Sequence, residues 1–253
     1  MKLQKLYSYL RQAIQEYDMI QEGDKIALGI SGGKDSLTLL YGLAGLRRFY
    51  PKHFELKAIT VDLGYGEFDV SRISALCQEL EVMYHVVHTQ IGDMVKEGEC
   101  SLCARLRKGA FGKKVKELGC NKIAYAHNMD DVIETMLLSL IYEGRFSTFW
   151  PVTPYEDTGM TVIRPLIFAP LSDVLGFSKE YRLPVMKNPC PFEKETNRTY
   201  VRNLLKDINT HAPGVRKRMM TAIKRGHLEG WSLQEFGIQK GGRVCSKKDH
   251  LKI

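Results

Sequence analysis

The sequence lacks any long apolar run, and it contains few cysteines for its length. No stretch approaches the roughly 18 consecutive apolar residues that a membrane-spanning helix needs, so we expect no contact with a membrane. The first 20 residues mix charges with helically spaced apolar residues and lack the compact apolar core of a secretory signal, which predicts a cytoplasmic protein. Six scattered cysteines are too few for a disulfide scaffold in 253 residues. We therefore expect thiols, metal ligands or redox-active groups.

Acidic residues are scarce in the last part of the chain. The whole sequence carries 37 Lys and Arg against 29 Asp and Glu, a net charge of +8. From Arg198 to the end there are 13 basic and 4 acidic residues, whereas residues 1–197 hold 24 and 25. The resulting excess of +9 in the C-terminal part indicates a polyanionic partner such as nucleic acid. A solvated basic surface is the plainer alternative.

The hydrophobic pattern alternates between short strands and longer helices. This order is typical of an α/β fold with a doubly wound, mostly parallel five-stranded sheet, in which ligands bind at the carboxyl ends of the strands. The predicted strands are 25–30, 55–62, 82–88, 122–127 and 160–166. The predicted helices of this domain are 36–48, 69–80, 101–118, 130–142 and 170–182.

The chain is predicted to divide into four parts. A hydrophobic content of 44% suits one large globular domain with a smaller appendage. An amphipathic helix covers 1–20, and the main domain covers 21–183. Several prolines then lead into a basic helical appendage at 184–230. The segment 231–253 is rich in Gly and Lys, which predicts a flexible tail.

The stretch LGISGGKDSLTLLYGLAGL at 28–46 predicts an anion-binding loop between a strand and a helix. Gly32 and Gly33 let the backbone turn and bring several N–H groups close to a phosphate, and the helix adds the positive end of its dipole. The loop also supplies two hydroxyls and a cation, from Ser31, Ser36 and Lys34. The spacing differs from a Walker A loop, and Asp35 would repel a γ-phosphate unless Mg²⁺ lies between them. This favours a pyrophosphate clamp with a metal bridge.

SGGKDS at 31–36 resembles the PP-loop of the N-type ATP pyrophosphatases, which cut ATP between the α- and β-phosphates and adenylate a carbonyl oxygen. AYAHNMDDVIET at 124–135 resembles the second signature of that family and departs from it at Ala126, where glycine is usual. The matching positions are His127, Asp130, Asp131, Glu134 and Thr135. The resemblance implies that Asp131 helps to hold Mg²⁺ and that the backbone around His127 approaches the nucleotide. From the residues alone, the two aspartates are also explained as capping partners of a helix N-terminus.

Two further side chains are expected near this edge of the sheet. Asp62, in VDLGYG, ends the second strand, and its carboxylate is either solvated or in contact with ribose or adenine. The family resemblance favours contact with the nucleoside. Arg164, in IRPL, is either an active-site cation or a salt-bridge partner.

Three cysteines have a pattern that predicts ligands. Cys100 and Cys103 form CSLC at the start of a helix, which puts both sulfurs near one face and favours thiolates. Cys190 lies in the proline-rich loop NPCPF. Three thiolates can bind three irons of a cubane cluster and leave one iron open, whereas zinc needs a fourth ligand, for which His211 or His127 is available. No role is predicted for Cys77, Cys120 and Cys245.

CSLCARLRKG together with AHNMDDVIET resembles the tRNA 2-thiocytidine synthetase branch of the PP-loop enzymes, over about residues 20–190. The resemblance implies ATP-dependent tRNA thiolation, in which the C2 carbonyl of a pyrimidine, here cytidine, is adenylated in a tRNA loop and its oxygen is replaced by sulfur. ATP, Mg²⁺ and a [4Fe-4S] cluster are the implied cofactors. The implied partners are tRNA, a sulfur donor (a cysteine desulfurase or sulfide) and a second copy of the chain. The implied catalytic residues are Lys34, Asp35, Cys100, Cys103 and Cys190. The implied nucleotide-binding residues are Ser31, Gly32, Gly33, Lys34, Asp35, Ser36, Asp62, His127 and Asp131, and Asp35 and Asp131 are the implied Mg²⁺ ligands.

Three other functions remain open from the sequence. A lysidine synthetase uses the same adenylation with an amine nucleophile, but it needs no cysteine trio. An iron–sulfur desulfidase acting on thio-bases would use the open iron, but it has no need of the PP-loop. A redox-sensing nucleic-acid binder without enzymatic activity would leave Lys34, Asp35 and Asp131 unused. The two signatures together favour tRNA thiolation.

Overall fold

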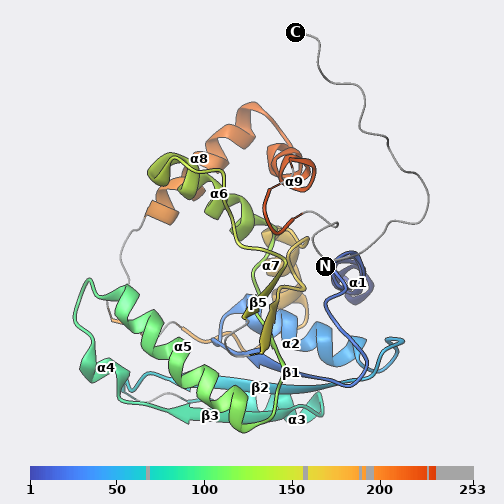
Figure 1. Ribbon diagram of the computed structural model, residues 1–253, viewed down its shortest axis with the longest axis vertical. Helices are drawn as coiled ribbons and strands as arrows, with labels where there is room; N and C mark the ends of the chain where they lie inside the picture. The colour runs from blue at the N-terminus through green and yellow to red at the C-terminus, as the bar shows by residue number, and fades with distance from the viewer. Residues whose placement is uncertain (67–68, 156–158, 188–189, 192–196, 227, 232–253) are drawn as a thin grey trace.

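A six-stranded sheet forms the centre of the protein (Figure 1). The structure is a computed structural model that describes residues 1–66, 69–155, 159–187, 190–191, 197–226 and 228–231. The strand order is β3-β2-β1-β4-β6-β5, and every neighbouring pair is parallel except β5 with β6. The strands are β1 (Asp24–Gly29), β2 (Phe54–Asp62), β3 (Met83–His88), β4 (Lys122–Ala124), β5 (Val152–Tyr155) and β6 (Met160–Ile163). The order reverses between β1 and β4, and ligands bind at such a switch point.

The predicted α/β class and parallel core are confirmed, but the predicted count of five strands is wrong. The strand that the sequence did not reveal is β5, which pairs antiparallel with β6 at the edge of the sheet. It is four residues long and contains Pro154, opposite Thr161. Because a proline cannot donate to a ladder, Pro154 argued against a strand in the sequence. The structure tolerates it because β5 is the edge strand of the sheet among the described residues.

Helices cover both faces of the sheet, because alternate residues of each strand point to opposite faces. On β1, Ile26 and Leu28 belong to one apolar cluster, whereas Ala27 between them belongs to a second cluster with Phe111 and Val115 of α5. The helices that precede the C-terminal part are α1 (Leu3–Glu16), α2 (Lys34–Leu46), α3 (Ser71–Glu79), α4 (Ile91–Met94), α5 (Cys100–Glu117), α6 (Met129–Glu143) and α7 (Leu171–Glu180).

The first helix packs into the main core. Leu6 and Leu10 of α1 are fully buried, and a Cβ on Gly42 of α2 would lie 2.6 Å from Leu10. The hydroxyl of Tyr9 donates to Asp173 of α7 at 2.7 Å. The apolar stripe of α1 is therefore used within this chain.

Two C-terminal helices, α8 (Asn197–His211) and α9 (Val215–Arg225), lie beside α6 (Figure 1). Val201 and Leu205 of α8 are fully buried. Trp231 packs edge-on against Tyr17, at the end of α1, with 6.1 Å between ring centroids. Most of the predicted tail, 232–253, lies outside the described residues, as does Cys245. Among the helices that the structure describes, none is both long and apolar enough to cross a bilayer.

Candidate functional site

The loop between β1 and α2 has the geometry of an anion cradle. Gly32 has φ +76°, a left-handed conformation that favours glycine, and Gly33 is the N-cap of α2. Ser36 Oγ accepts from the amide of Ser31 at 3.2 Å and donates to the carbonyl of Gly33 at 2.9 Å. The helix begins at Lys34, earlier than predicted, so its positive end opens directly onto the loop.

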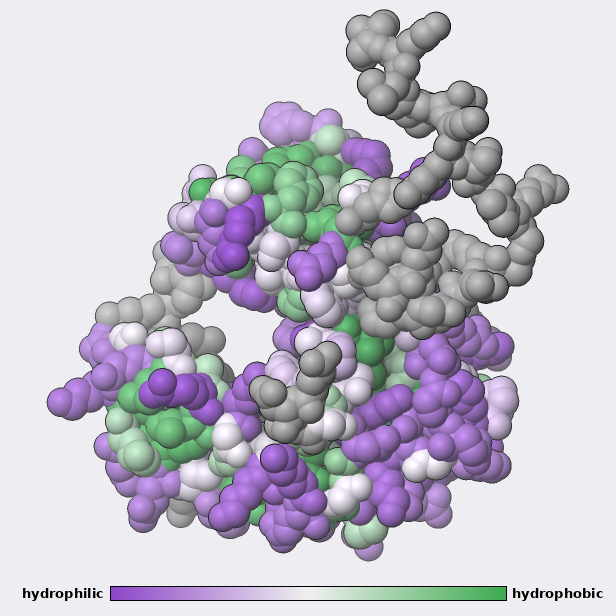
Figure 2. Space-filling model, viewed as in Figure 1, coloured by the Kyte–Doolittle hydropathy of each residue, from purple (hydrophilic) through white to green (hydrophobic). Residues whose placement is uncertain are grey.

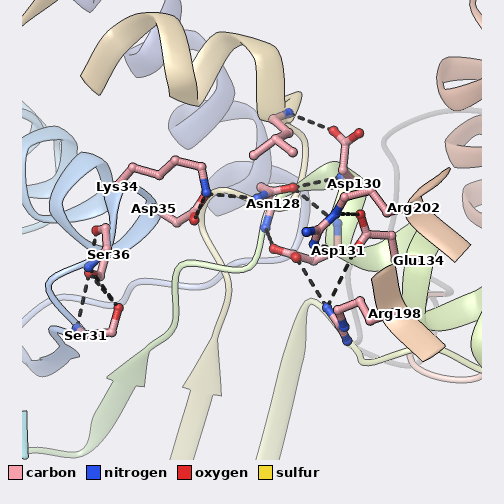
Figure 3. A network of polar contacts seen from close by, with 12 residues as sticks. Ser31, Lys34, Asp35, Ser36, Asn128, Asp130, Asp131, Glu134, Arg198 and Arg202 are labelled. Carbon is pink, nitrogen blue, oxygen red and sulfur yellow. Dashed lines mark hydrogen bonds and ion pairs between the residues drawn. The ribbon is translucent and has the colours of Figure 1, made fainter. Parts of the chain in front are cut away.

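Asn128 joins this loop to the start of α6 (Figure 3). Its side-chain amide donates to Asp35 Oδ1 at 3.0 Å, and its backbone amide donates to Asp131 Oδ2 at 2.9 Å. Its side-chain oxygen accepts from the amides of Asp130 and Asp131 and forms a capping box. One buried residue therefore positions two carboxylates from segments almost 100 residues apart.

The pair Asp35 and Asp131 fits a divalent cation. Burial raises the pKa of the Asp131 carboxyl, and the charge of Asp35 raises that pKa further. The hydrogen bond from the Asn128 amide and the charge of Arg198 lower the pKa, but the net shift is upward. A cation between the two carboxylates would relieve this repulsion. Mg²⁺ is commonly bound by one or two carboxylates together with substrate phosphates and water. Within the described ranges no group of three or more His, Cys, Asp or Glu side chains could hold a metal ion.

One pocket of about 740 Å³ brings the loop and the predicted sulfur ligands together. Its lining includes Asp35 and Ser36 from α2, together with His127 and Asp131. Ser31 and all three predicted sulfur ligands, Cys100, Cys103 and Cys190, are in the same lining. Figure 2 shows this face of the molecule hollowed between α5 and the region of α6 and α8. The segments meet because the parallel strands end at the same edge of the sheet.

The three thiols also influence one another. Burial raises the pKa of the Cys103 thiol; the charge of Arg107 lowers that pKa, and Cys190 and Cys100 raise it. Cys103 is thus close enough to Cys100 and Cys190 for their charges to oppose its own ionisation, an effect that a positively charged centre reverses. A cubane cluster binds each thiolate to a different iron and so tolerates sulfurs too far apart for one metal ion. Three thiols that line one pocket are donors of the kind that such a cluster takes, and within the residues described neither the thiols alone nor the thiols with His127 form a single-ion site.

His127 is neutral at physiological pH. Burial lowers the pKa of its imidazole to about 4, and the charges of Arg164 and Arg198 add to this effect. Its ring lies 4.6 Å from the ring of Phe149, and its Nδ1 is buried without a hydrogen-bond partner among the described residues. A neutral ring against the pocket wall suits stacking or hydrogen bonding with a base better than binding a phosphate charge.

The described residues support neither of the two roles that the sequence left open for Arg164. It is buried and outside the lining of the pocket, and no ion pair of Arg164 is found within the described part of the chain. Its guanidinium lies 5.1 Å from the centroid of Phe149 and donates to the carbonyl of Trp150 and to Thr153 Oγ1. Burial lowers its pKa to about 10. Arg164 thus fixes the edge hairpin and places a cation behind His127.

Four predicted nucleotide contacts, Gly32, Gly33, Lys34 and Asp62, lie outside the lining of the pocket. Asp62 accepts from the amide of Gly64 at 3.0 Å and lies 3.0 Å from His88 Nδ1, so its position gives no support to a contact with the nucleoside. Lys34 Nζ bonds to Asp35 at 2.7 Å, and neither Lys34 nor the glycines of the loop are among the lining residues. An incoming phosphate would have to draw Lys34 from this ion pair.

The second acidic signature divides into two functions. Asp131 faces the pocket, whereas Asp130 and Glu134 hold the C-terminal helices (Figure 3). Glu134 accepts from two nitrogens of Arg202 at 2.9 and 3.1 Å, and Asp130 accepts from Arg216 at 2.6 Å. Part of the basic charge that predicted nucleic-acid binding is therefore used inside the molecule. The described basic residues of α8 and α9 that remain exposed are Lys206, Lys217, Arg218 and Arg225.

Sequence reasoning missed two residues of this site. Asn128 could have been recognised from the capping-box order, with an amide side chain ahead of an acidic residue three positions later. Arg107 follows Cys103 by one helical turn and lines the pocket, which the helical spacing in CSLCARLRKG implied.

Comparisons with known proteins agree with this geometry. A family model described as a PP-loop domain matches residues 3–208. A tRNA-cytidine(32) 2-sulfurtransferase of Citrifermentans bemidjiense is 37% identical over 224 residues, with 85% of this chain and 88% of the relative covered. A protein of the same name from Geobacter sulfurreducens is 32% identical over 252 residues, covering 96% of both chains. The U34-tRNA thiolase NcsA of Methanococcus maripaludis, solved with its [4Fe-4S] cluster, has a TM-score of 0.73 at 23% identity, over 99% of this chain and 85% of that chain, which shows a shared fold.

Proposed function

This chain belongs to the PP-loop domain family, and on that premise we propose that it is an ATP-dependent tRNA 2-sulfurtransferase. The substrate is a pyrimidine in a tRNA loop, and the relatives' names favour cytidine at position 32. The observation that carries the proposal is that a single pocket is lined by the anion loop, by Asp131 and by three cysteines. Adenylation and sulfur delivery can then act on one bound base without its release.

The first half of the reaction uses the loop. The C2 oxygen of the base attacks the α-phosphorus of ATP, the bond between the α- and β-phosphates breaks, and pyrophosphate leaves. The amides around Gly32 and Gly33 and the start of α2 stabilise the departing negative charge. Asp35 and Asp131 would hold Mg²⁺, which neutralises phosphate charge when it is bound. Lys34 exchanges Asp35 for a phosphate oxygen as the charge develops.

The second half uses the cysteines. Cys100, Cys103 and Cys190 would hold a [4Fe-4S] cluster, which when bound supplies an iron that can take up inorganic sulfide. A sulfur nucleophile attacks C2, the C2–O bond breaks, and the oxygen leaves as part of AMP. A base must leave its stack to enter the pocket, which a single-stranded tRNA loop permits.

The exposed basic residues of α8 and α9 supply the electrostatic part of tRNA binding. The double substitution Lys206→Glu and Lys217→Glu is expected to weaken tRNA binding and to flatten its dependence on salt concentration, because phosphate contacts release fewer counterions. A matched charge reversal at exposed Lys2, at the start of α1, is expected to leave both unchanged. Equal affinities in a filter-binding titration of the double variant and the wild type would remove these helices from the tRNA interface.

The decisive experiment separates the two halves of the reaction. Reconstituted protein is incubated with ATP, Mg²⁺, sulfide and unmodified tRNA, and pyrophosphate release and 2-thiocytidine are both measured. We expect Cys190→Ala to release pyrophosphate and to form no 2-thiocytidine, because the loop is intact and one sulfur ligand is missing. Cys120→Ala, which alters a buried cysteine outside the pocket, is expected to behave as the wild type.

The outcomes discriminate between functions. A Cys190→Ala variant that thiolates tRNA at the wild-type rate would refute the assignment of the cysteines. A wild-type protein that releases pyrophosphate with tRNA and forms a product with no sulfur would indicate a different nucleophile. Absence of tRNA-dependent pyrophosphate release would refute the enzymatic function altogether.

A further inference from the structure

The loop at 63–66 is held beside the pocket by close contacts at Leu63 and Gly64. Gly64 has φ +82°, and a Cβ there would lie 2.7 Å from the carbonyl oxygen of Thr89. The amide of Gly92, in α4, donates to the carbonyl of Leu63 at 2.6 Å. The loop is therefore held in one position on the rim between β2 and α4.

Tyr65 lies in the middle of this fixed loop. A Cβ on Gly92 would lie 2.9 Å from two carbons of the Tyr65 ring, so the ring packs directly on the backbone of α4. Tyr65 lines the same pocket as Cys100, Cys103 and Cys190. Burial raises the pKa of its phenol, and the charges of these three thiols raise that pKa further. The mechanism above gives this side chain no task.

We propose that Tyr65 is a positioning residue whose hydroxyl donates a hydrogen bond to the sulfur-bearing group held by the three cysteines and thereby raises the reduction potential of that group. A phenol O–H is a donor at neutral pH, and thiolate and sulfide sulfurs are acceptors. One-electron reduction adds one negative charge to the group, and a donated hydrogen bond stabilises that charge. The proposal rests on the proposed cysteine ligation.

The test is a redox titration of reconstituted protein, followed by visible absorption or electron paramagnetic resonance. The Tyr65→Phe variant keeps the ring against Gly92 and removes the donor, so its midpoint potential is expected to shift to more negative values. Gly92→Ala pushes the ring away while keeping the hydroxyl, and we expect a shift of the same sign. Tyr84→Phe is the matched control, because the hydroxyl of Tyr84 donates to Thr60 Oγ1 at 2.9 Å and the residue is outside the pocket lining.

Iron and sulfide are measured in every variant, so that loss of the cluster is distinguished from a change in its potential. Equal midpoint potentials in loaded wild type and Tyr65→Phe would overturn the role of Tyr65 and leave the proposed thiolation untouched. A wild-type protein that takes up no iron and sulfide would overturn the cysteine ligation and the role of Tyr65 with it. A shift in Tyr65→Phe with no shift in Tyr84→Phe supports the proposal.

Discussion

Replacing Asn128 by alanine or by aspartate separates the two tasks of this buried residue. Its side-chain oxygen caps α6, and its side-chain amide donates to the Asp35 carboxylate. Alanine removes both. Loss of an N-cap costs about 1 kcal/mol, and loss of a hydrogen bond to a charged group costs about 1.5–3 kcal/mol. Because the Asp35 side chain is 28% exposed, we expect the lost hydrogen bond to cost the lower half of its range. Together with the lost N-cap, Asn128→Ala is then expected to lower the free energy of unfolding by about 3 kcal/mol.

Aspartate at position 128 keeps the capping oxygen and removes the donor. It also brings a third carboxylate beside Asp35 and Asp131, so the pKa of the new carboxyl in the folded state is raised above its unfolded value. The new carboxylate therefore destabilises the folded state fully at neutral pH. This destabilisation is lost as the pH falls and the new carboxyl becomes protonated. We expect Asn128→Asp to approach the wild-type stability at low pH, whereas Asn128→Ala keeps a constant deficit.

Urea unfolding followed by circular dichroism, at pH 7 and pH 5, measures both effects. Added Mg²⁺ is expected to stabilise Asn128→Asp more than the wild type, because it neutralises the added charge. An Asn128→Ala variant within about 0.5 kcal/mol of the wild type, the usual range for a surface substitution, would show that the bridge between the loop and α6 contributes nothing to stability.

Three further changes test other parts of the structure. Glu134→Gln breaks the ion pair with Arg202, in which the Glu134 side chain is 1% exposed and the Arg202 side chain 42% exposed. After allowing for solvent screening, we expect the free energy of unfolding to fall by about 2 kcal/mol. A double-mutant cycle with Arg202→Met, followed by urea unfolding, measures this loss. His127 has a pKa lowered to about 4, so the unfolded state binds its proton first as the pH falls, and stability drops between about pH 6.5 and pH 4, by about 2 kcal/mol at pH 5. An NMR titration that gives an imidazole pKa above 6 contradicts this. Gly32→Ala places a Cβ 3.1 Å from Met186 on left-handed backbone. We expect it to lower the free energy of unfolding by about 1–2 kcal/mol and to weaken ATP binding. Gly33 has a negative φ, so Gly33→Ala is expected to reduce stability less, as measured by thermal unfolding.

The sequence was sufficient for the features that depend on local pattern. Apolar runs alternating with amphipathic helices predicted the parallel sheet, because each run supplies a strand buried on both faces. The meeting of Cys100, Cys103 and Cys190 near the anion loop followed from topology, since the segments that carry them lie at one end of the sheet. These inferences required no knowledge of individual side-chain contacts.

The features that sequence could not reveal depend on contacts between distant segments. Pro154 hides an edge strand whose existence depends on pairing with β6. Asp130 and Asp131 are adjacent and chemically alike, yet one binds Arg216 and the other faces the pocket, because successive residues of a helix point in different directions. The basic excess of the C-terminal part likewise gave no sign that Arg202 is paired with Glu134.

The position of Arg198 has a consequence for how the two substrates communicate. Its guanidinium lies 3.4 Å from Asp131 Oδ1 and 3.8 Å from Glu134 Oε2, at the first turn of α8. If Asp131 holds a metal ion as proposed, that ion would compete with the guanidinium for this oxygen and would loosen one attachment of the helix. By thermodynamic reciprocity, an RNA phosphate that draws Arg198 away would then strengthen metal binding by the same factor. Under the proposed function, metal loading and tRNA docking would favour each other through a single shared oxygen atom.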